Sequence, residues 1–166
     1  LIYMTITITN KTIRPIYPTM QKTKLVNLEE LPLFARELVD DLRVQDRVAL
    51  MGEMGAGKTT LVKAIAKALG YEGMVKSPTF TILNEYKLPT DNDFAGLKKI
   101  IHADFYRFEN FKDIQALDLE SELNNETIFF AEWPERVDKM DWEPTVVIKM
   151  IWISPTVLEI GWERLD

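Results

Sequence analysis

The amino-acid sequence predicts an α/β protein whose central sheet is mainly parallel, with antiparallel edge strands and a C-terminal hairpin. Short apolar runs, typical of buried strands, alternate along the chain with stretches whose apolar residues recur at helical spacing. Near the end, two β-prone runs flank Ser154-Pro155, where a tight connection is expected. Strands that alternate with helices pack as a parallel sheet covered by helices, so we expect this layered architecture.

The chain is long enough for one domain with a substantial core. Its 166 residues contain no internal repeat, no low-complexity segment and no interdomain linker. We therefore assign residues 25–166 to a single domain. Residues 1–24 form an N-terminal extension or edge segment, because Ile6 and Ile8 alternate with threonines ahead of two prolines. That pattern fits an edge strand and a loose tail equally well.

Composition excludes several classes of site and of partner. The chain has no cysteine, which excludes disulfides and thiolate metal sites, and its single histidine excludes a histidine metal cluster. The net charge of −6 argues against a large basic surface for direct binding of nucleic acid. No apolar run approaches the roughly 20 residues of a membrane span, and no secretory pattern is present. We therefore expect a cytoplasmic protein that does not bind a membrane.

An amphipathic helix is expected before residue 43. Asn27 and Glu30 have the spacing of a capping box. Pro32 fits only the first turn of a helix because it lacks an N–H, so we expect the helix to begin near residue 31. A polar turn at residues 45–47 then leads to an apolar strand at residues 48–51. The apolar stripe of this helix comprises Leu28, Leu31, Phe34, Ala35, Leu38 and Leu42.

Residues 52–59, Gly-Glu-Met-Gly-Ala-Gly-Lys-Thr, match the phosphate-binding loop pattern G-x-x-x-x-G-K-[ST] at every fixed position. An apolar strand precedes them, and apolar residues at helical spacing follow them as far as Gly70. Glycines let backbone N–H groups turn toward a phosphate, and the helix N-terminus adds partial positive charge. Lys58 can reach the β- and γ-phosphates, and the Thr59 hydroxyl can ligate Mg²⁺.

The loop motif and its strand–loop–helix context together predict a three-layer sandwich like that of the P-loop NTPases, and a bound nucleotide with Mg²⁺. The loop residues expected to bind the nucleotide are Glu53, Met54, Gly55, Ala56, Gly57, Lys58, Thr59 and Thr60.

The segments after this first helix alternate between strand, loop and helix. The segment 88–99 is predicted to be a flexible surface loop, because it contains Pro89, Gly96 and a run of acidic and amide residues. In chain order we expect a strand at 81–87, this loop, a strand at 100–105, a helix that begins at Asn110 and carries Phe111, Ile114 and Leu117, a strand at 128–131, and hairpin strands at 146–153 and 157–162.

Two acidic residues compete for the metal site that a nucleotide hydrolase needs. Asp104 ends the apolar run 100–103, and Glu132 ends the run 128–131. Ligands of open α/β sheets lie beyond the carboxyl ends of the strands, so both acids are expected near the phosphates. The residues alone do not decide between them.

Four further residues have weaker signals. Thr79 follows a proline in a turn, where its hydroxyl either serves the turn or senses Mg²⁺ and the γ-phosphate; the residues alone favour the turn. His102 is expected to be a hydrogen-bonded strand residue rather than a catalyst. Arg107 either steadies a phosphate or pairs with an acid. Trp133 is either a core residue or a lid over the site.

Four blocks of sequence resemble the TsaE (YjeE-type) bacterial ATPases. The resemblance extends over about residues 25–165, and the combination of the blocks is far more specific than the phosphate-binding loop alone. The blocks are Gly-Glu-Met-Gly-Ala-Gly-Lys-Thr-Thr at 52–60, Ser-Pro-Thr-Phe at 77–80, His-Ala-Asp-Phe-Tyr-Arg at 102–107 and Glu-Trp-Pro-Glu at 132–135.

The resemblance implies a role for each matching position of the site. Lys58 and Thr59 would hold the phosphates of ATP and Mg²⁺, and Glu132 would be the Walker-B acid. Asp104 would be an essential acid near the attacking water or the metal, and Thr79 would belong to a switch-like loop. In this family, Trp133 would lie near the nucleotide.

The resemblance also implies a biological setting. The family takes part in making threonylcarbamoyladenosine at position 37 of tRNAs that read codons starting with A. The protein would work with two partners, TsaB and TsaD, and would meet tRNA indirectly through that complex. ATP hydrolysis, weak in the isolated chain, would support turnover of the complex, while TsaD transfers the threonylcarbamoyl group.

Other functions remain open at this point. A small-molecule kinase shares the loop and the α/β core, but residues 88–99 contain no arginine for a kinase lid. A nucleotide-dependent scaffold without catalysis is a third class. A GTPase is disfavoured because no Asn-Lys-x-Asp segment is present to read the base. The sequence leaves the oligomeric state of the free protein undecided.

Overall fold

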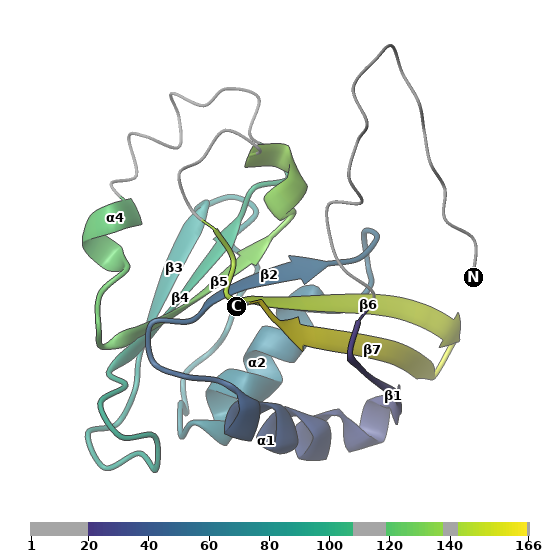
Figure 1. Ribbon diagram of the computed structural model, residues 1–166, viewed down its shortest axis with the longest axis horizontal. Coiled ribbons are helices and arrows are strands. Elements are labelled where there is room, and N and C mark those ends of the chain that lie inside the picture. The colour runs from purple at the N-terminus through teal and green to yellow at the C-terminus, as the bar shows by residue number, and fades with distance from the viewer. Residues whose placement is uncertain (1–19, 108–118, 138–142, 166) are drawn as a thin grey trace.

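The computed structural model of the chain describes residues 20–107, 119–137 and 143–165. Within them, seven strands form one sheet in the order β1-β7-β6-β2-β5-β4-β3 (Figure 1). The strands are β1 Lys22–Asn27, β2 Arg47–Met51, β3 Leu83–Lys87, β4 Lys99–Asp104, β5 Thr127–Glu132, β6 Val146–Ser154 and β7 Val157–Arg164. The helices are α1 Leu31–Asp41, α2 Lys58–Ala68, the short α4 Leu119–Glu122, and two 3₁₀ turns at Leu28–Glu30 and Pro134–Val137.

The centre of the sheet is parallel and its edges are antiparallel. Strand β2 runs parallel to both β5 and β6, and β5 runs parallel to β4. At one edge β3 runs antiparallel to β4, and toward the other edge β7 runs antiparallel to β6 and the edge strand β1 runs antiparallel to β7. The predicted α/β fold, with its parallel centre and C-terminal hairpin, is therefore confirmed. The middle residues of β2 and all of β5 are buried, as continuous apolar runs require in a sheet with both faces covered.

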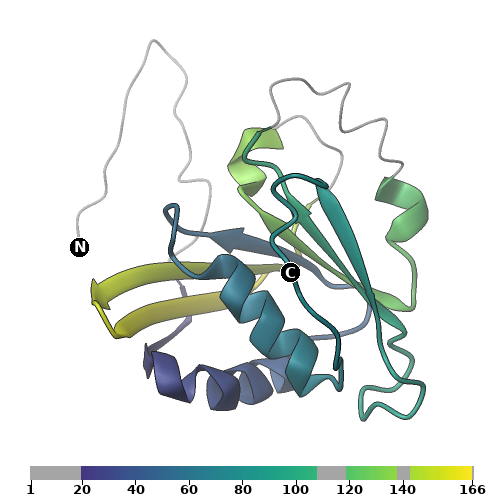
Figure 2. The ribbon, with the colours of Figure 1, turned by 180° about the vertical axis from the view of Figure 1, so that it is seen from behind.

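Helices α1 and α2 lie side by side on one face of the sheet, as both views show (Figures 1 and 2). Their fully buried side chains, among them Phe34, Leu61 and Ile65, pack on residues of alternate strand positions such as Leu50 and Phe130. The opposite face carries a second cluster in which Phe105 and Phe129 pack with Leu119 of α4. Alternation along each strand thus decides which side chains face α2.

The start of α1 follows the expectation from Pro32. A 3₁₀ turn at Leu28–Glu30 leads into α1, which begins at Leu31, so Pro32 occupies the first turn where its missing N–H breaks no bond. The Asn27 backbone N–H donates to Glu30 Oε2 at 3.3 Å. Strand β1 begins at Lys22, inside the segment that the sequence separates as an extension.

Strand β3 begins later than expected, at Leu83 rather than at residue 81, because Ile82 turns with a φ of 71° and its N–H donates to the Pro78 carbonyl. The segment that follows is a loop as far as Lys98, and within it the Asn92 side chain donates to the carbonyls of Pro89 and Leu97. Leu97 is buried beneath it. The helix expected to begin at Asn110, with Phe111, Ile114 and Leu117, lies outside the described residues.

The turn at residues 45–47 contains a buried ion pair that composition does not reveal. Asp46 is only 4% exposed, and Arg164 of β7 donates to both of its carboxylate oxygens at 2.8 Å. Thr145 donates to the same carboxylate at 2.7 Å. This cluster joins the start of β2 to the end of β7.

None of the described helices has the length and apolar character needed to cross a bilayer.

Candidate nucleotide-binding site

A cavity of about 660 Å³ opens at the carboxyl ends of β2, β4 and β5, beside the N-terminus of α2. Of the site residues predicted from sequence, all except Glu53 line it. Four parts of the chain supply them: the glycine-rich loop with the start of α2, the segment 77–80, the end of β4 and the end of β5. The sheet therefore brings together residues from four separate stretches of the chain.

The glycine-rich loop adopts backbone conformations that side chains resist. Gly55 and Gly57 have φ values of 80° and 93°, in the left-handed region, and Gly57 directly precedes α2. A Cβ on Gly52 would lie 2.7 Å from the Met150 carbonyl oxygen. The loop can therefore wrap closely around an anion at the positive end of the α2 dipole.

Lys58 is held inside the loop, where it is buried and only 4% exposed. Its Nζ donates to the carbonyls of Gly52 at 2.7 Å and Glu53 at 2.9 Å, so Glu53 belongs to the site through its backbone. Burial lowers the pKa of Lys58, and the negative charges of Glu132, Glu135 and Asp104 oppose that shift. A cation surrounded by acids and carbonyls at a cavity wall can turn toward a bound phosphate.

Trp133 lies over this lysine rather than in the core. The Lys58 Nζ is 4.2 Å from the centre of the Trp133 ring. The ring of Tyr106 also packs against Trp133, with 5.0 Å between the two ring centroids. Trp133 also has a φ of 57°, an uncommon value for a bulky residue. The sequence left Trp133 as either a core residue or a lid over the site. Its place in the cavity lining favours the second of these interpretations.

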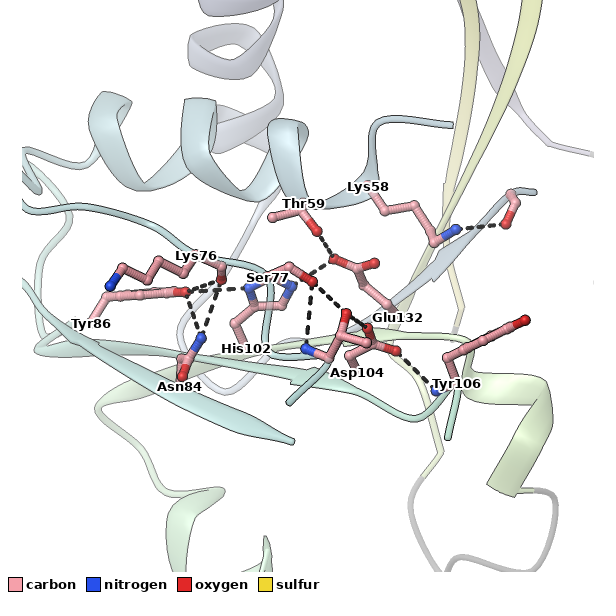
Figure 3. Close-up of polar contacts among 12 residues, drawn as sticks. Lys58, Thr59, Lys76, Ser77, Asn84, Tyr86, His102, Asp104, Tyr106 and Glu132 are labelled. Atoms are coloured by element: carbon pink, nitrogen blue, oxygen red, sulfur yellow. Dashed lines mark hydrogen bonds and ion pairs between the residues drawn. The ribbon is translucent and has the colours of Figure 1, made fainter. Parts of the chain in front are cut away.

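Glu132 meets the first turn of α2. The Thr59 hydroxyl donates to Glu132 Oε1 at 2.6 Å, and His102 Nε2 lies 2.9 Å from the same oxygen (Figure 3). Among the described residues, no three His, Cys, Asp or Glu side chains converge as a metal cage. A hydroxyl and a carboxylate at a phosphate site are the protein ligands that Mg²⁺ needs, because phosphates and water complete its octahedron. These residues therefore fit Mg²⁺.

Asp104 lies one strand farther from α2 and faces the segment 77–80. In the register of β4 and β5 it is opposite Glu132. The Thr79 hydroxyl donates to Asp104 Oδ2 at 2.7 Å, and the Tyr106 backbone N–H donates to Oδ1 at 2.9 Å. Ser77 Oγ is 2.6 Å from the Thr79 hydroxyl. Thr79 therefore sits in a turn and also contacts an acid of the cavity.

Sequence reasoning did not select several residues that line the cavity. Ser77, Phe80 and Tyr106 belong to blocks quoted for the resemblance, which was the signal available for them. Arg107 also lines the cavity, with its guanidinium carbon 4.6 Å from the centre of the Phe80 ring. Phe80 itself is 83% exposed. His102 is a hydrogen-bonded strand residue as expected, and its partner is Glu132.

Comparison with known protein families identifies relatives over most of the chain. The model of the family described as "Threonylcarbamoyl adenosine biosynthesis protein TsaE" matches residues 25–156. This range includes the glycine-rich loop, the segment 77–80 and the ends of β4 and β5.

Three curated relatives are named "tRNA threonylcarbamoyladenosine biosynthesis protein TsaE". The Aquifex aeolicus protein is 39% identical over 119 residues, which cover 70% of this chain and 79% of that one. The Bacillus subtilis protein is 34% identical over 118 residues, covering 71% and 69%. The Haemophilus influenzae protein is 37% identical over 89 residues, covering 54% of this chain and 52% of that one.

A solved structure shares the fold. The crystal structure of Bacillus subtilis YdiB superposes with a TM-score of 0.65 at 27% sequence identity, and the match covers 90% of each chain. The arrangement of strands and helices described above is therefore also that of an experimentally determined relative.

Proposed function

The chain belongs to the TsaE family of threonylcarbamoyladenosine biosynthesis proteins, and from that premise we propose that it is a Mg²⁺-dependent ATPase acting with TsaB and TsaD. Its hydrolysis of ATP supports the modification of tRNA at position 37. The observation that carries the ATPase proposal is the 2.6 Å hydrogen bond between Thr59 and Glu132 beside the glycine-rich loop. A hydroxyl and an acid in this relation are the protein half of a magnesium–nucleotide site.

In this proposal the loop and the start of α2 bind the phosphates. Backbone N–H groups of residues 53–60 surround them, and Lys58 leaves the loop carbonyls to supply its charge to the β- and γ-phosphates. Thr59 and Glu132 would hold Mg²⁺, which would supply positive charge to the phosphate oxygens as negative charge develops on them during hydrolysis.

In this proposal Asp104 and Thr79 orient the water that attacks the γ-phosphate. Both residues line the cavity with Lys58, and their 2.7 Å contact sets a carboxylate beside a hydroxyl, where together they can accept hydrogen bonds from a water and orient it. The segment 77–80 that carries Thr79 is the part of the site able to respond to the γ-phosphate, as switch loops do. Trp133 covers the phosphate-binding lysine and borders the nucleotide.

We further propose that the isolated chain hydrolyses ATP weakly and that its partners stimulate it. Within the described residues, Arg107 is the arginine that lines the cavity, and its guanidinium is stacked on Phe80. A charge delivered to the γ-phosphate by a partner can raise the rate by roughly 10³–10⁵. The net charge of −6 supports contact with tRNA through the complex rather than directly.

The experiment that tests this proposal is steady-state ATP hydrolysis by the chain alone and with purified TsaB–TsaD. The variant Lys58→Ala serves as the blank in both arms. We expect stimulation that disappears in the blank. Fast turnover by the isolated chain, unchanged when the partners are added, would reject the coupled ATPase and return attention to a small-molecule kinase.

A further inference from the structure

A line of buried polar side chains crosses the sheet beneath α2. Tyr86 of β3 is 4% exposed, His102 of β4 is fully buried, and Glu132 of β5 is 5% exposed. All three point to the face covered by α2, because they alternate with residues of the opposite cluster such as Ile101. Figure 3 shows them in one row between the segment at Lys76 and the first turn of α2.

The contacts along this row are continuous. The Tyr86 hydroxyl donates to the Lys76 carbonyl at 3.0 Å, and its oxygen lies 3.5 Å, a longer contact, from His102 Nδ1. His102 Nε2 lies 2.9 Å from Glu132 Oε1, the oxygen that also accepts from Thr59. The row therefore joins the residue just before the segment 77–80 to the acid at the end of β5.

The Glu132 end of the row decides which ring nitrogen donates. Nε2–H donates to the Glu132 carboxylate, because a carboxylate oxygen only accepts, and Nδ1 lies against the Tyr86 hydroxyl. The Lys76 carbonyl accepts from the Tyr86 hydroxyl and also from the Asn84 side-chain amide at 3.2 Å. The imidazole is therefore hydrogen-bonded through Nε2 and packed against Tyr86 on its other side.

A buried polar ring in this place needs an explanation beyond packing. The neighbouring positions on the same face, Ile100 and Phe130, are fully buried and apolar. A polar group among them is tolerated only when it is hydrogen-bonded, so an apolar residue would be the simpler choice at position 102 for stability alone. What the imidazole adds is a fixed donor on one carboxylate oxygen of a side chain with three rotatable bonds.

We propose that His102 and Tyr86 are positioning residues for Glu132. His102 donates to the carboxylate oxygen that also accepts from Thr59, and Tyr86, which donates to the Lys76 carbonyl, packs against the imidazole. The orientation of the metal-side acid is thereby linked to the base of the segment that carries Thr79. This inference rests on the proposed Mg²⁺–nucleotide site, since Glu132 needs a fixed orientation only if it serves a metal.

A matched pair of substitutions at position 102 separates positioning from packing. In His102→Gln the amide nitrogen can occupy the place of Nε2 and keep the bond to Glu132. In His102→Asn the shorter side-chain amide reaches only the place of Nδ1, so the bond to Glu132 is lost while a polar group still faces Tyr86. Both variants put a primary amide into the same buried space, so a purely structural role would affect them alike.

The measurement is the equilibrium affinity for a fluorescent ADP analogue, without Mg²⁺ and across a Mg²⁺ titration, together with urea unfolding. We expect His102→Asn to raise the Mg²⁺ concentration for half-maximal binding about 10- to 100-fold, the usual effect of losing such a supporting contact. His102→Gln should stay within about threefold of the unchanged chain. Affinity without Mg²⁺ should be the same in all three proteins.

The variant Tyr86→Phe tests the other end of the row and removes a single oxygen atom. We expect faster hydrogen exchange in a peptide spanning residues 76–82, by about tenfold, and a smaller rise in the Mg²⁺ requirement than in His102→Asn. This variant also decides the matter if His102→Asn does not fold. An unchanged Mg²⁺ requirement and unchanged exchange in Tyr86→Phe would then overturn the inference.

The remaining outcomes distinguish the inference from the function on which it rests. If the unchanged chain binds the ADP analogue without any dependence on Mg²⁺, both the proposed metal site and the positioning role are rejected. If that dependence is present but His102→Asn and His102→Gln behave alike, the positioning role alone is rejected and the proposed function stands.

Discussion

The Thr59 hydroxyl donates to Glu132 Oε1 at 2.6 Å, across 73 positions of sequence. This bond joins the first turn of α2 to the end of β5 and sets the two protein groups of the proposed metal site side by side. It exists because β5 is the immediate parallel neighbour of β2, the strand that leads into the glycine-rich loop. The predictions below each test one part of the site or of the frame that holds it.

Removing the loop lysine should abolish productive hydrolysis. We expect Lys58→Ala to slow single-turnover ATP hydrolysis about a hundredfold, which corresponds to roughly 3 kcal/mol of lost electrostatic stabilisation in the transition state. Lys63→Ala, an exposed lysine on the same helix, is the matched control and should retain activity. Unchanged hydrolysis by a folded Lys58→Ala protein would refute the assignment of the loop.

Neutralising the acid of β5 should affect the metal more than the nucleotide. Glu132→Gln keeps the shape of the side chain but removes the charge that holds Mg²⁺, so hydrolysis at limiting Mg²⁺ should fall while nucleotide affinity without metal is kept. Glu72→Gln changes an exposed acid that does not line the cavity and is the control. If Glu132→Gln hydrolyses ATP normally at limiting Mg²⁺, Asp104 becomes the leading metal ligand.

The hydroxyl of Thr79 should matter for the rate rather than for binding. Thr79→Val keeps the shape but removes the 2.7 Å bond to Asp104, and a lost hydrogen bond to a charged group corresponds to about a 10- to 100-fold fall in kcat. Thr79→Ser keeps the hydroxyl and should restore most of the rate. Equal kinetics in the two variants, measured at saturating ATP, would assign Thr79 to turn chemistry only.

The buried pair at the other end of the sheet should make stability depend on pH. Burial alone would raise the pKa of Asp46, but hydrogen bonds from Arg164, Thr145 and the Arg43 N–H outweigh it and hold the pKa below the usual 3.8. Because the folded-state pKa is depressed, this stabilisation is fully present above the unfolded value near 3.8 and is lost as the pH falls below it toward the folded value.

The test of this pair is urea unfolding of Asp46→Asn from pH 7 down to pH 3. We expect the variant to be less stable by about 3 kcal/mol at pH 7, because the Arg164 guanidinium loses its bidentate partner, and to approach the unchanged chain as the pH falls below 4. Asp40→Asn alters an exposed acid and should change neither quantity. A stability difference that is constant over this range would show that the pair does not titrate with folding.

Local patterns in the sequence were sufficient for the elements whose own residues decide their structure. The phosphate-binding loop needs glycines at fixed places, and strand β5 is an unbroken apolar run, so both were predicted where they occur. The expected turn at residues 45–47 was also right. Its buried Asp46 could not be predicted, because the partner Arg164 lies 118 residues later on another strand.

The sequence by itself predicted a nucleotide site at residues 52–59, and it determined that Asp104 and Glu132 would end buried strands. Only the tertiary structure decided which acid meets Thr59. The strand order β2-β5-β4 puts Glu132 next to the start of α2 and Asp104 one strand away, beside Thr79. Strand order depends on how distant apolar surfaces pack together, and no periodicity within a single strand records its neighbours, so the two acids were equivalent until the sheet was assembled.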